Sequence, residues 1–146
     1  MKKIILGTVQ LGIEYGVNNK LGKPSRQVAY DILHKAHSLG IDTLDTAENY
    51  GESHSIIADF HKQVNYKFKI ITKYSKNTPN LGSDIVARMK QHCNNFNVQK
   101  LSGYMFHSYS DFKESLIENP NILKKLKSSN YAEKIGVSVH TNKEIE

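Results

Sequence analysis

The sequence predicts an α/β fold of the (β/α)8 TIM-barrel type, with only about five strand–helix units present. Short apolar runs alternate with helical patterns at intervals of about thirty residues, as in right-handed βαβ units on a parallel sheet. The loop after the first run lacks the G-x-G-x-x-G spacing of a dinucleotide-binding open sheet. Polar side chains follow successive apolar runs, as they do around the mouth of a barrel. A flavodoxin-like open sheet is the alternative on length alone.

Five short segments, rich in apolar residues, are predicted to be strands. They are residues 3–7, 41–45, 68–73, 101–107 and 135–139. The first is a continuous apolar run closed by a glycine and is expected to be a buried strand. The second alternates apolar and polar residues, which is typical of a strand with one face in a core.

The helices are predicted from apolar residues at helical spacing and from capping residues. Residues 8–24 are expected to be a long loop, and Ser25 is placed as an N-cap before the first helix, which Gly40 ends. The apolar positions of this helix are Val28, Ile32, Leu33, Ala36 and Leu39. Further helices are expected over residues 53–61, 82–95 and 111–128, the last broken near Pro120 by the clash of a proline ring inside a helix.

Composition indicates one folded domain over residues 1–146. Hydrophobic residues make up 38% and charged residues 23%, which is unlike a disordered chain. The single cysteine, Cys93, excludes an internal disulfide and suits a reducing compartment. The apolar run that follows the basic N-terminus is too short for a signal peptide, and no segment is long enough to span a membrane. A cytoplasmic protein is therefore expected.

The net charge of +6 raises the question of a polyanionic partner. The lysines are scattered, and the one dense cluster, at Lys124, Lys125 and Lys127, lacks interleaved aromatic residues. We interpret that cluster as a solvated helix face and expect no nucleic acid partner.

Four residues at or near the ends of successive strands form a candidate site. Asp45 ends the second predicted strand, Tyr50 follows in the loop, and Lys73 and His107 end the next two strands. A phenol is a weak acid at neutral pH, but a neighbouring ammonium stabilises its phenolate. Lys73 could supply that charge, Asp45 could hold Lys73, and His107 could bind a substrate oxygen. The set suits protonation of a carbonyl that is becoming an alcohol.

Each of these residues also has a purely structural interpretation. Asp45 could cap a turn, Tyr50 could pack on the surface, Lys73 could extend from a strand end into water, and His107 could be a core histidine. The coincidence of all four on adjacent strand ends favours the catalytic interpretation.

Five short motifs carry a resemblance to the aldo-keto reductases, which are (β/α)8-barrel enzymes that use NADP(H) or NAD(H). They are LGT at 6–8, GIDTLDTAENYG at 40–51, ITK at 71–73, MFH at 105–107 and KIGVS at 134–138. The resemblance implies a small-molecule carbonyl substrate and no metal. It implies the catalytic residues Asp45, Tyr50, Lys73 and His107. It implies cofactor contacts from Gly7, Thr8, Val9, Asp45 and Ser138.

Two features depart from the family pattern. Val139 and His140 follow Ser138 where many members have an asparagine, a form that resembles a branch found near bacterial sugar and polysaccharide genes. The chain also resembles only the N-terminal part of a barrel that typically needs about 250 residues.

Three hypotheses follow: a fragment of a carbonyl reductase, a short non-catalytic barrel fragment that acts as a binding or assembly module, and, from charge alone, a polyanion-binding protein. Open sheet edges should make the chain self-associate or pair with a missing C-terminal part.

Overall fold

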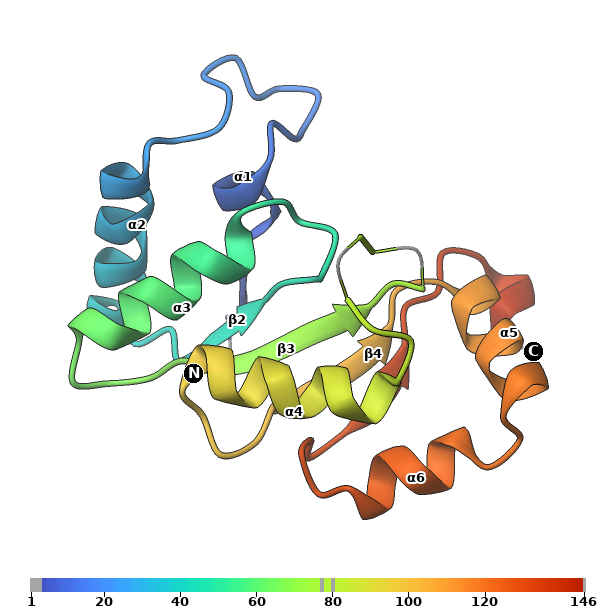
Figure 1. Ribbon diagram of the computed structural model, residues 1–146. Helices are drawn as coiled ribbons and strands as arrows, with labels where there is room; N and C mark the ends of the chain where they lie inside the picture. Colours follow the sequence, from blue (N-terminus) through green and yellow to red (C-terminus); the bar gives the residue numbers. More distant parts are fainter. Residues whose placement is uncertain (1–3, 77, 80, 146) are drawn as a thin grey trace.

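A parallel sheet of five strands forms the centre of the molecule (Figure 1). The computed structural model describes residues 4–76, 78–79 and 81–145. The strands are β1 (Leu6–Gly7), β2 (Thr43–Asp45), β3 (Lys69–Tyr74), β4 (Gly103–Phe106) and β5 (Ile135–Val137). Their order in the sheet is their order in the chain, with Leu44 opposite Ile70 and Ile71 opposite Gly103. A doubly wound sheet reverses its strand order at a switch point, so this unreversed order is that of a partial barrel.

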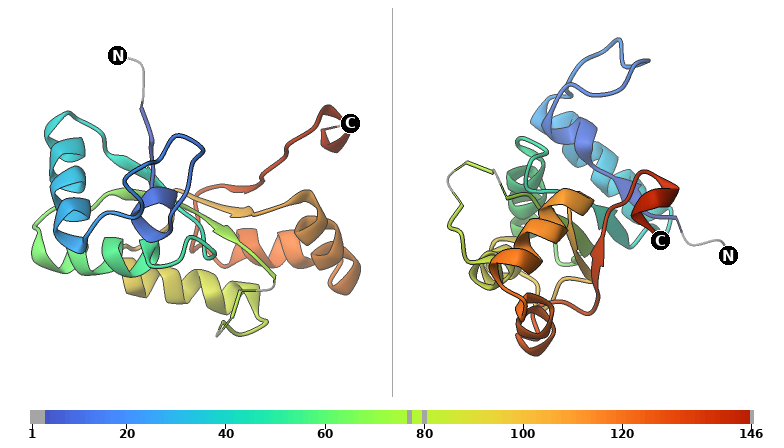
Figure 2. Two further views of the ribbon diagram at one scale, coloured as in Figure 1. Left: turned by 90° about the horizontal axis from the view of Figure 1, so that it is seen from above. Right: turned by 90° about the vertical axis from the view of Figure 1, so that its right-hand side faces the viewer.

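Helices connect the strands and gather on one side of the sheet. They are α1 (Val9–Gly12), α2 (Arg26–Ser38), α3 (Ser53–Gln63), α4 (Ile85–Phe96), α5 (Tyr109–Glu118) and α6 (Ile122–Ser128). A 3-10 turn, η1 (Asn142–Glu144), follows β5. Figure 2 shows α3, α4 and α6 along one face of the sheet, while no helix covers the opposite face in the described part of the chain.

The hydrophobic core lies between the sheet and these helices. The strands contribute fully buried residues such as Leu44, Ile70 and Tyr104, and the helices contribute Phe60 and Phe96 among others. Successive side chains of a strand point to opposite faces, so Ile71 and Met105 lie on the face without helices, where they are only half-buried. In a closed barrel this second face is the interior.

The first strand is shorter and more exposed than the sequence predicts. Only Leu6–Gly7 pairs with β2, and Lys3 lies outside the described residues. Ile4 and Ile5 are 63% and 46% exposed, so the prediction of a buried strand from residue 3 is wrong. The physical reason is that β1 is an edge strand with no neighbour on its outer side within the described sheet.

The buried face of α2 also differs from the predicted apolar set. Ser25 caps the helix as predicted, because its hydroxyl accepts a hydrogen bond from the Val28 amide at 3.3 Å. The buried residues include Leu33, but Val28, Ile32 and Leu39 are exposed. Figure 1 shows α2 at one end of the helix layer, so its outer flank has no described helix to pack against.

The other observed helix and loop boundaries agree in outline with those predicted from the sequence. The predicted long loop contains the single turn α1. The helix expected from residue 82 begins at Ile85, after Asp84 caps the Val86 and Ala87 amides at 2.9 and 3.2 Å. The break near Pro120 is confirmed, since α5 ends at Glu118 and α6 starts at Ile122. Over the described part of the chain, no helix has the length and apolarity that crossing a bilayer requires.

Candidate active site

The loop that follows β2 is fixed against β3 by main-chain hydrogen bonds. The amide of Thr46 donates to the Ile71 carbonyl at 2.9 Å, and the amide of Glu48 donates to the Lys73 carbonyl at 3.1 Å. A turn then forms, in which the Tyr50 amide donates to the Ala47 carbonyl at 3.1 Å. These contacts hold Tyr50 beside the end of β3.

Lys73 is the centre of the candidate site. Its ammonium lies 2.5 Å from Asp45 Oδ1, 3.1 Å from the Thr46 carbonyl oxygen and 3.5 Å from the Tyr50 hydroxyl. The Lys73 side chain is only 9% exposed, whereas that of Asp45 is 38% exposed. A buried ammonium needs a counterion, and Asp45 provides one while its own outer side faces the mouth. The structure therefore brings Asp45, Tyr50 and Lys73 together.

His107 completes the group from the next strand. Its ring lies edge-on to the Tyr50 ring, with 5.9 Å between centroids, and its amide donates to the Tyr74 carbonyl at 2.8 Å. Burial, and then the nearby Lys73 charge, lower the pKa of His107 below its ordinary value, so the imidazole is neutral at neutral pH. Its Nδ1 atom is buried without a hydrogen-bond partner among the described residues. A neutral imidazole offers one N–H donor and one acceptor.

Sequence reasoning missed a buried charge cluster behind this site. The Glu48 carboxylate accepts hydrogen bonds from Arg88 at 2.9 Å, His92 at 2.8 Å, Tyr104 at 3.0 Å and the Ser75 amide at 3.0 Å. The sequence holds one signal of it, because Arg88 and His92 are four residues apart on the otherwise apolar face of α4. Glu48 itself lies in a polar loop and looks exposed from sequence alone.

The residues predicted to bind the cofactor lie in two places at the mouth. Gly7, Thr8 and Val9 lead out of β1 beside Asp45, and Ser138 follows β5 at the other edge of the sheet. The Thr8 hydroxyl is already engaged, since it donates to the Asp45 carbonyl at 3.0 Å and accepts from Ser53 at 2.8 Å. Gly7 is exposed, and a Cβ added there would meet no described atom within 4 Å. The open space at Gly7, which pairs with Asp45 in the sheet, leaves room for a flat ring such as a nicotinamide at the C-terminal ends of the strands.

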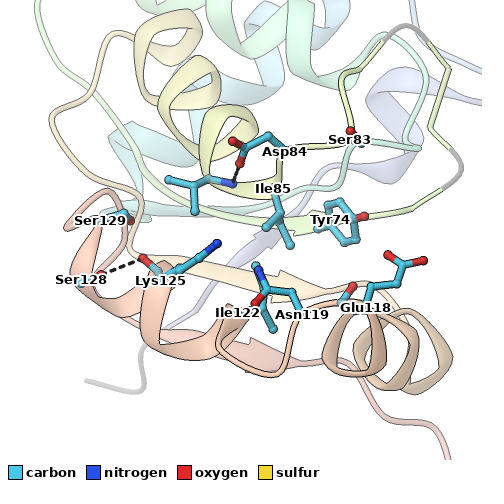
Figure 3. Close-up of a pocket in the computed structure, with 12 residues that line it drawn as sticks. Tyr74, Ser83, Asp84, Ile85, Glu118, Asn119, Ile122, Lys125, Ser128 and Ser129 are labelled. Atoms are coloured by element: carbon cyan, nitrogen blue, oxygen red, sulfur yellow. Dashed lines mark hydrogen bonds between the residues drawn. The ribbon is translucent and has the colours of Figure 1, made fainter.

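One cavity of the described structure lies away from the candidate catalytic residues. This cavity of about 520 Å³ lies between α4 and the α5–α6 segment, lined by Tyr74, Asp84 and Lys125 among others (Figure 3). Its walls include none of the four predicted catalytic residues. Within the described ranges, no group of three or more histidine, cysteine or acidic side chains could hold a metal ion.

Comparisons with known proteins identify the family and the fold of the chain. The model of the aldo/keto reductase family matches residues 3–146. No curated protein matches the sequence.

Three similar solved structures share the fold at low sequence identity. PA4992 of Pseudomonas aeruginosa, described as an aldo-keto reductase, has a TM-score of 0.70 and 23% identity over 94% of this chain and 55% of its own. The glycerol dehydrogenase AKR11B4 of Gluconobacter oxydans has a TM-score of 0.69 and 20% identity over 98% and 46%. A mutant of Gox0644 in complex with NADPH has a TM-score of 0.67 and 18% identity over 99% and 47%.

The chain thus spans about half the length of each of these structures. Its five sequential parallel strands correspond to part of their barrel, and the family match covers nearly all of its residues. The chain therefore belongs to the aldo/keto reductase family.

Proposed function

We propose that this chain carries the proton-donating site of an oxidoreductase that reduces a small aldehyde or ketone with a nicotinamide cofactor. The observation that carries the proposal is the placement of the Lys73 ammonium between Asp45 and the Tyr50 hydroxyl. Asp45 serves as the counterion of the buried ammonium, but that need does not account for the Tyr50 phenol beside it at the strand ends, where barrel enzymes build their sites.

In this proposal Tyr50 donates its proton to the carbonyl oxygen as that oxygen gains negative charge. The Lys73 ammonium stabilises the phenolate that remains, and Asp45 keeps Lys73 charged and oriented. The neutral imidazole of His107 donates a hydrogen bond to the same carbonyl oxygen and fixes its position. The T-shaped contact between the Tyr50 and His107 rings, with 5.9 Å between centroids, supports this pairing of roles.

The reduced nicotinamide, when bound, supplies the hydride. The residues that would hold it are Gly7, Val9, Asp45 and Ser138, with Thr8 supporting the first loop from inside. The Gox0644 complex with NADPH favours NADP(H), and NAD(H) is the alternative.

Exchange of the proton donor tests the proposal. In any full-length form of the protein, Tyr50→Phe should lower turnover of a test aldehyde by about 100-fold or more, since general acid catalysis contributes about 10²–10⁴-fold, and should leave NADPH affinity nearly unchanged. Lys73→Met should have the same effect on turnover. Tyr15→Phe, at an exposed loop tyrosine, is the matched control. Unchanged turnover in Tyr50→Phe would exclude Tyr50 as the donor.

A second candidate function is that of a non-catalytic binding or assembly module. The observation behind it is the apolar surface along the β1 edge, which includes a groove of about 370 Å³ between β1, the loop after α1, and α2. The exposed apolar residues there are Ile4, Ile5, Leu21, Val28 and Ile32. We propose that further strand–helix units cover this edge, supplied by a longer chain, a complementing chain or a second copy.

A further inference from the structure

The Glu48 carboxylate is the most deeply buried acidic group that the structure describes. Its side chain has 0% exposed surface, and that of Arg88 has 3%. Both carboxylate oxygens are fully used: Oε2 accepts from Arg88 and the Ser75 amide, and Oε1 accepts from His92 and Tyr104. A charge buried this deeply is stable only when it is paired and hydrogen-bonded.

The partners keep Glu48 ionised. The hydrogen bonds from His92 and Ser75, with the Arg88 charge, outweigh the opposing effect of burial and lower the pKa of Glu48. Burial and the adjacent carboxylate raise the pKa of Tyr104 well above its ordinary value, so this phenol stays protonated and donates. Glu48 is therefore a fixed acceptor for four donors.

Glu48 contacts the end of β3 at Lys73 and at the residue two further on. The Glu48 amide donates to the carbonyl of Lys73 itself, and its carboxylate accepts from the amide of Ser75, two residues further on. In its own segment, Glu48 lies three residues after Asp45 and two before Tyr50. Glu48 thus joins the segment of Asp45 and Tyr50 to the segment of Lys73.

Arg88 extends this contact to the loop that follows β3. Besides Glu48, its guanidinium donates to the carbonyls of Ser75 at 2.9 Å and Gly82 at 2.5 Å. The loop after Lys73 is therefore attached to α4 at two places. The helix, which packs in the core through Met89 and Phe96, provides a rigid support.

We propose that Glu48 is a positioning residue that sets the distance between the Lys73 ammonium and the Tyr50 hydroxyl. The Glu48–Ser75 hydrogen bond is the contact under test, because it adds to the main-chain bonds of this loop and joins it to the segment just beyond Lys73. Glu48 touches no reacting atom in this proposal. Its effect on turnover rests on the proposed function, whereas its effect on the place of Lys73 does not.

A matched pair of double variants tests the proposal. Arg88→Met is included in both, so that no unpaired cation is left buried. Glu48→Gln/Arg88→Met keeps an acceptor for the Ser75 amide, because the other partners, His92 and Tyr104, can each switch to accept from the glutamine NH₂. Glu48→Leu/Arg88→Met has similar bulk and no acceptor. Glu48→Ala/Arg88→Met replaces the leucine variant if that variant does not fold, as judged by circular dichroism.

The first readout is the ¹H–¹⁵N signal of the Lys73 side-chain ammonium, assigned by its absence in Lys73→Met. We expect this sheltered group to exchange slowly with water in the wild type and in the glutamine variant. In the leucine variant its exchange should be at least about 10-fold faster, as the contacts to Asp45 and Tyr50 loosen. Glu52→Gln, on the same loop but exposed and paired with Lys23, should leave the signal unchanged.

The second readout is the steady-state rate with a test aldehyde. The leucine variant should lower kcat about 10- to 100-fold, the cost of a displaced catalytic group, with little change in KM. The glutamine variant should keep most of the rate. Equal ammonium exchange in the two folded variants would overturn the proposal. Turnover that is insensitive to Tyr50→Phe would instead overturn the proposed function, and the ammonium signal would still decide the role of Glu48.

Discussion

His61 shows how a buried titratable residue is held neutral in this core. Its Nδ1 donates to the Phe96 carbonyl at 2.7 Å, and its Nε2 accepts from the Phe68 amide at 3.1 Å. A second ring proton would break the contact with Phe68, and burial lowers the pKa of His61. Burial lowers the pKa of His54, which is hydrogen-bonded to Thr72, to about 3.

These two histidines predict a pH dependence of stability. Between about pH 6.5 and 4.5 the unfolded chain binds a proton on His54 while the folded chain does not. The pKa of His61 is also lowered, so His61 acts in the same direction. The free energy of unfolding should therefore be greatest above pH 6.5 and fall as the pH decreases, by up to about 1.4 kcal/mol per pH unit for each histidine. Urea unfolding at several pH values measures this.

The contribution of one residue can be separated by substitution. His54→Gln should flatten the pH dependence, because it removes the group with the pKa lowered to about 3. A wild-type stability that does not vary between pH 7 and 5 would contradict the prediction.

At this same scale, the sequence predicted the four candidate catalytic residues but not the residue that holds them. Asp45, Lys73 and His107 could be found because strand ends are visible as breaks in apolar runs. Glu48 could not, because its partner His92 is 44 residues away in sequence. Burial of an acid depends on such distant donors, and the spacing of Arg88 and His92 on α4 does not show which acid they meet.

The contact between α1 and the loop before α3 shows how one element fixes the place of Tyr50. A Cβ added to Gly12 would lie 1.7 Å from the Tyr50 carbonyl oxygen and 2.5 Å from the Ser53 amide nitrogen. Gly51 has a φ of +53°, which L residues with side chains rarely adopt. Two glycines thus let the backbones approach closely.

Gly12→Ala should displace the Tyr50 segment and destabilise the fold by about 1–3 kcal/mol, as overpacking commonly does. Since the clash is with main-chain atoms, a side-chain rotation cannot relieve it. Thermal unfolding measures the loss, and turnover should fall with it. Gly82→Ala, where an added Cβ would meet no described atom within 4 Å, is the control. Equal stability of the two variants would argue against the close approach.

The sequence predicted all five strand positions and, in outline, the helices other than α1, with the break at Pro120 separating α5 from α6. It missed α1, because a single turn is too short to show helical periodicity. It also assigned Val28 and Ile32 to the apolar face of α2, although both are exposed. Helical spacing shows which residues form an apolar face. Which flank of that face is buried depends on where the neighbouring helix packs.

At the scale of the whole molecule, the described sheet is open at both edges, which has an energetic cost. β1 and β5 are both edge strands, and such edges pair readily with other chains. Each Å² of apolar surface left in water forfeits roughly 25 cal/mol, so several hundred Å² would remove much of the roughly 5–15 kcal/mol that stabilises a domain.

We therefore predict that the 146-residue chain self-associates or binds a complementing chain, and that it binds NADPH much more weakly than a complete reductase. Sedimentation velocity over a range of concentrations tests the first part, and NADPH fluorescence titration tests the second. Val28→Lys/Ile32→Lys should reduce self-association through the β1 edge. A stable monomer with micromolar NADPH affinity would contradict both parts.

The agreement between strand order and chain order also bears on synthesis by the ribosome. Each strand of the sheet pairs with the strand made just before it, and a nascent chain emerges N-terminus first. Asp45, Tyr50 and Lys73 are therefore all present once β3 has emerged, α4 then brings Arg88 and His92 to Glu48, and β4 brings Tyr104 and His107. In the described part of the chain, the side-chain hydrogen bonds and ring contacts of these residues extend no further than His107, so the geometry of the candidate site can be set while later residues are still being translated.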